Sequence, residues 1–230
     1  MNQSLNDLGG IIASPGITLA KLMEKKVWVL SFILILVATF VFTFVTYPIN
    51  KVEQAKLIRN SEIADRLPEE QLANLDKFTP VQRVTSSFFQ MVFIALALVI
   101  GAFFVYLFFK VANATGTYGH FFCGVVNASI IDVGLGGLLK SLLVLQKKSI
   151  FVSTSLTLLT PGSDFRSLGF QILSQFDFFS LWFLAALALG IAGFEKMPVK
   201  KSIFVTVLYF LFKSTVIVAI SYFSMRLIKM

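Results

Sequence analysis

Two ionisable residues of opposite charge lie inside segments that are otherwise apolar. Asp132 interrupts the run from Phe121 to Leu145, and Lys213 interrupts the run from Ser202 to Phe223. If these runs cross a lipid bilayer, each central charge costs at least about 2.5–3.5 kcal/mol on insertion scales, and a partner lowers that cost. Three interpretations follow: an ion pair that fixes how two helices associate, a path for protons or a solute, or two charges that reach water independently.

The residue types and spacings that most enzymes need are missing. The chain has one histidine, His120, and one cysteine, Cys123, and it contains no Walker motif, HExxH or CxxC. Neither nucleotide binding nor a metal site is therefore indicated. An intramembrane aspartyl protease would need aspartates in two spans, and no second apolar run contains an acid at the depth of Asp132. We expect no catalytic residue, no cofactor, no metal and no intrachain disulfide.

The composition predicts an integral membrane protein. Of the 230 residues, 57% are hydrophobic and only 14% are charged, and the mean hydropathy is +0.83. Soluble domains are roughly 45–50% apolar and about 25% charged. The net charge of +8 comes mostly from residues beside apolar runs. Such residues orient a protein and meet anionic lipid headgroups, so nucleic-acid binding is not expected.

Five apolar runs are candidates for helices that cross the ~30 Å hydrocarbon core. They predict an all-α bundle with span one at 27–47, span two at 88–109, span three at 121–145, span four at 178–194 and span five at 202–223. The remaining parts are an amphipathic cytoplasmic segment at 1–26, a helical extracytoplasmic loop at 48–87 and a second loop at 146–177. Residues 150–160 are apolar but too short to cross, and both an interfacial and a re-entrant position stay open.

Lysines in the short flanks predict the orientation of the bundle. They are Lys21, Lys25 and Lys26 before span one, and Lys196, Lys200 and Lys201 between spans four and five. With five spans, both groups lie on one side, and the positive-inside rule makes that side cytoplasmic. We therefore expect a cytoplasmic N-terminus and an extracytoplasmic C-terminus.

This topology places the two central charges at the same depth. Asp132 and Lys213 each lie eleven residues into their spans, and both spans run outward. At 1.5 Å per residue, each lies ~16 Å from the cytoplasmic edge. The hypothesis is an Asp132–Lys213 ion pair, direct or bridged by water. Lys140 lies nearer the outer edge and can extend toward the interface.

Small residues recur every four positions on two of the spans. The predicted helix-packing face consists of Gly124, Ala128 and Gly136 on span three and Ala186 and Gly190 on span four. Such small-xxx-small faces let membrane helices approach closely. Asp132 falls on the same face of span three, where a partner helix is expected.

The long first loop and the N-terminal segment are the extramembrane parts with helical patterns. In the loop, Pro68 followed by two glutamates is typical of a first helical turn. A docking surface for a partner would consist of Leu67, Pro68, Leu72, Leu75 and Phe78; the alternative is a simple connector. A short helix at 17–26 would lie on the cytoplasmic membrane surface, where it could shape the bilayer or only anchor the chain.

The layout as a whole resembles bacterial members of the Yip-domain family, whose eukaryotic relatives interact with Rab-type GTPases. The resemblance covers residues 11–223 and rests on "IIASPGITLAKLMEKKVW", "LPEEQL" and "FDFFSLWFLAALALGIAGFEKMPVKKS". It implies five spans, a cytoplasmic N-terminus, no known catalytic activity and work through partners. Asp177 and Trp182 are the family-like residues at the start of span four, and helix capping is the simpler role for Asp177. The short N-terminal segment fits a bacterial inner membrane better than GTPase-linked traffic.

The function expected from these features is a non-enzymatic accessory or scaffold subunit in the membrane. Its partners would be lipids and another membrane complex, for which an ABC-type exporter is the candidate, or a second copy of itself. One alternative is a small solute or proton transporter or channel that uses Asp132 and Lys213. Another is a membrane-shaping homo-oligomer driven by the N-terminal helix.

Overall fold

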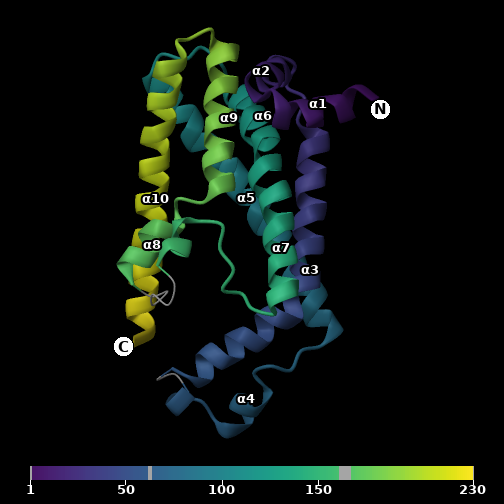
Figure 1. Cartoon of the computed structure of the whole chain (residues 1–230), viewed down its shortest axis with the longest axis vertical. Helices are drawn as coiled ribbons and strands as arrows, with labels where there is room; N and C mark the ends of the chain where they lie inside the picture. The colour runs from purple at the N-terminus through teal and green to yellow at the C-terminus, as the bar shows by residue number, and fades with distance from the viewer. Residues whose placement is uncertain (1, 62–63, 161–166, 230) are drawn as a thin grey trace.

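The computed structural model describes residues 2–61, 64–160 and 167–229, with side chains from residue 6 to residue 224 within these ranges. All regular elements there are helices. Five are long and apolar enough to cross a membrane: α3 (Val29–Arg59), α5 (Pro80–Val111), the continuous stretch Tyr118–Lys147, α9 (Phe178–Glu195) and α10 (Val199–Lys229, apolar to Ser224). They stand side by side in one bundle (Figure 1). The predicted five-span, all-α fold is confirmed.

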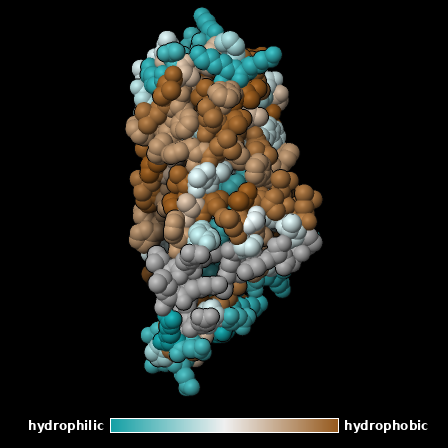
Figure 2. Space-filling view, turned by 90° about the vertical axis from the view of Figure 1, so that its left-hand side faces the viewer, coloured by the Kyte–Doolittle hydropathy of each residue, from teal (hydrophilic) through white to brown (hydrophobic). Residues whose placement is uncertain are grey.

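The outside of the bundle is as apolar as its inside. Figure 2 shows a broad band of hydrophobic side chains between hydrophilic ends. Large side chains such as Phe93 (66% exposed) and Phe204 (62% exposed) point outward from α5 and α10. In water such a surface would drive aggregation, whereas in a bilayer it meets lipid tails.

The bundle has two different ends. The α2 end carries α1 (Asn2–Ala13), α2 (Pro15–Lys25) and the turn from α9 to α10, and the α4 end carries η1 (Ala64–Arg66), α4 (Glu69–Asn74) and the last turns of α3 (Figure 1). Arg59 ties this second end together, because it binds the Asp76 carboxylate at 2.9 Å and the Leu72 carbonyl at 3.1 Å. The backbone N–H of Asp76 and the Arg59 guanidinium hold the pKa of this exposed carboxyl below its usual value.

The first span continues as a helix well beyond its predicted end at residue 47. α3 runs through Pro48 to Arg59. A proline inside a helix leaves the carbonyl four residues earlier without its N–H donor, and here that carbonyl belongs to Phe44. Arg83 of α5 fills the gap: its Nε donates to the Phe44 oxygen at 2.6 Å, and its guanidinium lies 3.8 Å from the centre of the Phe44 ring. The second span also begins early, at Pro80 after a Thr79 cap.

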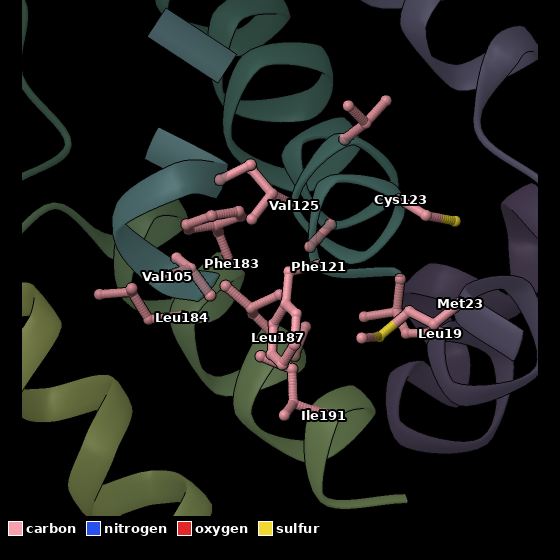
Figure 3. Packing of buried hydrophobic residues seen from close by; sticks show 14 of the residues in the cluster. Leu19, Met23, Val105, Phe121, Cys123, Val125, Phe183, Leu184, Leu187 and Ile191 are labelled. Carbon is pink, nitrogen blue, oxygen red and sulfur yellow. The ribbon is translucent and has the colours of Figure 1, made fainter. Parts of the chain in front are cut away.

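The short helix α2 is part of the bundle core rather than a helix on the membrane surface. Leu19 and Met23 are fully buried against α9 and α6 (Tyr118–Ser129). Figure 3 shows both side chains next to the buried cluster that includes Phe121, Leu187 and Ile191. The expectation that this helix lies on the lipid surface differs from what is found, because its apolar face is already covered by protein.

The third span is not a regular α-helix. It consists of α6, a π-helical stretch η2 (Ile130–Gly136) and α7 (Gly137–Lys147). A π-helical stretch widens the turn, changes which side chains share a face, and is frequent at functional sites. Asp132 lies in this stretch.

The fourth span is much shorter than its neighbours. α9 has 18 residues and α10 has 31, which correspond to about 27 Å and about 46 Å. α9 ends at the α2 end, and its first residue lies well short of the α4 end, so the chain before it has to reach into the bundle (Figure 1). That chain contains η3 (Leu156–Leu159) and α8 (Leu168–Ser174).

Candidate polar site inside the bundle

The structure does not bring Asp132 and Lys213 together as an ion pair. The four ion pairs among the described residues involve other groups. Asp132 accepts a hydrogen bond from the Ser180 hydroxyl of α9 at 3.0 Å instead. The reason is the order of the helices: α9 packs against η2 on one side and against α10 on the other, so it separates the two charges (Figure 1).

An ion pair joins Lys140 and Asp177 in place of the expected one. The Lys140 Nζ lies 3.0 Å from the Asp177 Oδ2. Asp177 is also the N-cap of α9, the simpler role expected for it, because its Oδ1 accepts from the backbone N–H groups of Phe179 and Ser180. Lys140 therefore does not extend freely toward the interface, as the sequence suggested, but holds the start of the short fourth span.

The segment before η3 supplies the remaining partner of Asp177. The Thr154 hydroxyl donates to Asp177 Oδ2. Backbone bonds join Phe178 N to the Thr154 oxygen at 3.1 Å and Leu156 N to the Phe176 oxygen at 3.2 Å. Three hydroxyls next to these bonds, those of Ser153, Ser155 and Thr157, are hydrogen-bonded to one another at 2.7–2.8 Å.

These contacts describe where the ambiguous segment 150–160 lies. Lys140 is seven residues before the end of α7 at Lys147, which is about 10 Å along the helix axis. Because Thr154 and Asp177 sit at the level of Lys140, the segment turns back along α7 instead of leaving the bundle. This geometry favours the re-entrant alternative, with the polar Ser155 and Thr157 buried against the bundle and Leu158 and Leu159 exposed.

A pocket of about 750 Å³ opens beside the ion pair, and we call it the α7–α8 pocket. Its walls come from α7, residues 150–160 and α8, and its lining includes Lys140, Lys147, Ser155, Thr157 and Asp177 together with apolar side chains. In the described ranges, no three His, Cys, Asp or Glu side chains gather as a metal site would require.

The five small residues of the predicted packing face are all buried. Gly124 and Gly190 face α2, because a Cβ added to them would lie 2.9 Å from Met23 Sδ and 2.5 Å from Leu19 Cβ. Gly136 faces α9, where an added Cβ would meet Phe179 Cβ at 2.9 Å. The close approach therefore involves α2 as much as the spans themselves.

The predicted docking loop is only partly available to a partner. Pro68 is exposed, but Leu67, Leu72, Leu75 and Phe78 are half-buried. Phe78 packs edge-to-face on Tyr47 of α3, with ring centroids 5.3 Å apart. At the start of α9, Trp182 is half-buried and contacts the Phe178 ring at 6.0 Å.

Three polar residues with structural roles were missed in the sequence. Arg83 completes α3, as described above. Glu195 accepts from the backbone N–H groups of Thr115 and Gly116 at 2.8 Å and so fixes the turn between α5 and α6. Asn127 donates to the Val27 carbonyl at 2.8 Å and joins α6 to the start of α3. The sequence feature that could have indicated these roles is that each residue is polar and lies in or beside an apolar run.

The comparisons with known proteins agree with this architecture. The sequence matches the Yip1 domain family over residues 9–221. Neither a curated protein nor a solved structure matches it. The match covers most of the chain and includes α2, the first four long helices, residues 150–160 and most of α10. The chain therefore belongs to the Yip1 domain family of membrane proteins.

Proposed function

We propose that this protein is a non-enzymatic accessory or scaffold subunit that binds another integral membrane protein through a groove between α9 and α10. The observation that carries the proposal is a buried hydroxyl without a partner in that groove. The groove has a volume of about 290 Å³ and is otherwise lined by apolar side chains such as Leu184, Leu189 and Phe210. Thr206 lines it as well.

The Thr206 hydroxyl is one of three buried hydroxyls that have no hydrogen-bond partner among the described residues, together with those of Thr39 and Ser214. Thr206 itself is 5% exposed. A hydroxyl in an apolar environment without a hydrogen bond costs roughly 1–3 kcal/mol by mutational measures. Lipid tails cannot supply the bond, whereas a serine, threonine or carbonyl of another membrane helix can. The groove is therefore better matched to a helix with a polar group than to lipid alone.

A second groove lies on the other side of α10 and supports the proposal that the outer face of α10 is a binding surface. It lies between α5 and α10, has a volume of about 480 Å³ and is lined by residues such as Phe108, Val111 and Leu208. Phe204 and Leu211 are exposed on α10. α10 stands at the edge of the bundle (Figure 1), so a partner helix can reach this face without disturbing the core.

The partner complex that we propose is an ABC-type exporter in a bacterial inner membrane. Support comes from the family, whose members are not known enzymes, and from the lack of a Walker motif, which leaves energy coupling to another chain. The basic residues at the α2 end, among them Lys21, Lys26 and Lys200, favour a cytoplasmic N-terminus by the positive-inside rule. The C-terminus of α10 then faces outward.

Photo-crosslinking inside the membrane tests the binding face. A photoreactive amino acid at Val207, which lines the groove and is 47% exposed, should link to the partner. The same amino acid at Ile33 of α3, which is 51% exposed, is the matched control and should give only lipid adducts. Equal crosslinking from both positions, or none from Val207, would contradict the proposed face.

The hydroxyl itself is tested by Thr206→Val, which keeps the shape and removes the polar group. Hydrogen bonds between membrane helices contribute about 0.6 kcal/mol on average and up to about 1.7 kcal/mol. The amount of partner that is recovered with the purified variant in detergent should therefore be about 3- to 20-fold lower than with the unchanged protein. The stability of the isolated protein should stay equal or rise, because an unsatisfied group has been removed. Unchanged partner recovery would refute the role of this hydroxyl.

A second candidate function, a path for protons or a solute, is favoured by one observation. The Lys140–Asp177 pair and the α7–α8 pocket place ionisable groups at the start of a short span, beside a span that contains a π-helical stretch. Ionisable groups within membrane spans often mark a path for protons or a solute. Purified protein in liposomes should then show a flux that Asp177→Asn abolishes without unfolding the protein. Membrane shaping by α2 has less support, since its apolar face is buried.

A further inference from the structure

We propose that the α7–α8 pocket binds a phosphodiester headgroup, and that its occupant is a phospholipid of the leaflet at the α4 end. The proposal concerns a different surface from the α9–α10 groove and does not depend on it. It rests on the charge that remains unpaired in the pocket, on the shape of its walls and on its position in the bundle.

The acid in the pocket has no capacity left for a ligand. Asp177 Oδ1 accepts from two backbone N–H groups, and Oδ2 accepts from Thr154 and Lys140. A cation would therefore have to displace an existing partner. The carboxylate also compensates the charge of Lys140, so these two residues together leave the pocket close to neutral.

Among the described residues of the lining, the remaining charge is positive. Lys147 lines the pocket, is exposed, and has no ion-pair partner among the described residues. It lies seven residues after Lys140 on the same helix, which is about two turns and places both on one face. An anion can meet the exposed Lys147, while the Lys140 ammonium and the half-buried Ser174 and Thr160 also line the pocket.

The walls of the pocket fit an amphiphile better than a small free anion. The lining combines hydroxyl groups with the apolar side chains of Ile150, Val152, Leu158 and Phe170. Free phosphate would fill a small part of the volume of about 750 Å³ and leave the apolar wall uncovered. A phospholipid places its phosphate at Lys147, its glycerol ester groups near the hydroxyls and the start of its chains along the apolar wall.

Native mass spectrometry of the full-length protein in mild detergent tests the proposal with three probes. Phosphatidylglycerol should remain bound, diacylglycerol should not, and inorganic phosphate should compete only weakly. Diacylglycerol that binds as well as phosphatidylglycerol would overturn the phosphate requirement. Inorganic phosphate that competes at equal concentration would keep the anion site and overturn the lipid as its occupant.

Two variants locate the binding. Lys147→Gln should weaken phosphatidylglycerol binding about fivefold, the value for losing one cation near an anionic headgroup. Lys148→Gln removes the same charge one residue away, outside the lining, and should leave binding unchanged. Leu158→Trp replaces a side chain that is 64% exposed, so it should fold normally and block the pocket. Equal weakening by both lysine variants, or full binding to Leu158→Trp, would overturn the site.

Discussion

Replacing Gly190 by alanine should lift α2 from the bundle and expose the thiol of Cys123. The added Cβ would lie 2.5 Å from the Leu19 Cβ. Carbon atoms pack at about 3.5–4.0 Å, so the two helices would have to separate by about 1 Å. Overpacking of this kind costs about 1–3 kcal/mol, and the better helix propensity of alanine returns at most about 1 kcal/mol.

The single cysteine of the chain reports this movement directly. Cys123 is fully buried, and its Sγ lies 3.2 Å and 3.4 Å from the carbonyl oxygens of Leu22 and Val27, either of which can accept its one S–H, where α2 turns into α3. Its thiol can be alkylated only when α2 moves away. A net loss of about 1–2 kcal/mol for the docked state should raise the rate of maleimide labelling about 5- to 30-fold.

Gly101→Ala is the matched control, because it makes the same change inside another long helix. There the added Cβ would meet only the Tyr209 hydroxyl at an ordinary 3.5 Å, so labelling of Cys123 should stay slow. The reasoning is refuted if Gly190→Ala labels as slowly as Gly101→Ala. It is also refuted if Cys123 in the unchanged protein reacts as fast as in denaturant.

Three further perturbations have definite expected outcomes. Asp177→Asn and Lys140→Met should each lower the unfolding free energy in detergent by about 1–3 kcal/mol, because each leaves a polar or charged partner unsatisfied. The double variant should lose less unfolding free energy than the sum of the two single losses. Additive losses would contradict the Lys140–Asp177 pair. Arg83→Gln should destabilise the protein by a similar amount, but far less in a Pro48→Ala background, where the helix satisfies its own carbonyl; an equal loss in both backgrounds would contradict this role. Because the pKa of Asp76 is lowered, this carboxylate stabilises the loop at the α4 end fully above the ordinary carboxyl pKa, and the stabilisation is lost as pH falls through the lowered pKa. Proteolysis of the loop should therefore rise at acidic pH. Asp76→Asn should make the loop equally susceptible already at neutral pH.

The long helices could be predicted because hydropathy alone specifies them. A run such as 88–109 has no competing structure in a membrane, and α5 contains it entirely. Helix ends were harder, since they depend on distant partners. Nothing local indicates that α3 continues through Pro48, because the residue that satisfies the freed carbonyl is Arg83, far along the chain.

The ion pair could not be predicted because depth does not determine which helices are neighbours. Asp132 and Lys213 were placed at one level, but α9 stands between their helices and offers Ser180 to Asp132. The pair that forms involves Lys140 and Asp177. The sequence feature that pointed to this pair was the short fourth apolar run. A short run starts inside the bundle, where the acid that precedes it can meet a charge from another span.

Purification of the tagged protein in mild detergent, followed by mass spectrometry of what accompanies it, is the decisive measurement for the proposed function. We predict a permease or ATPase subunit of an exporter in stoichiometric amount, with its recovery reduced 3- to 20-fold by Thr206→Val, as expected for one membrane hydrogen bond of about 0.6–1.7 kcal/mol. A homo-oligomer without any other subunit, unaffected by Thr206→Val, would contradict the proposal that this protein is an accessory subunit of another membrane complex.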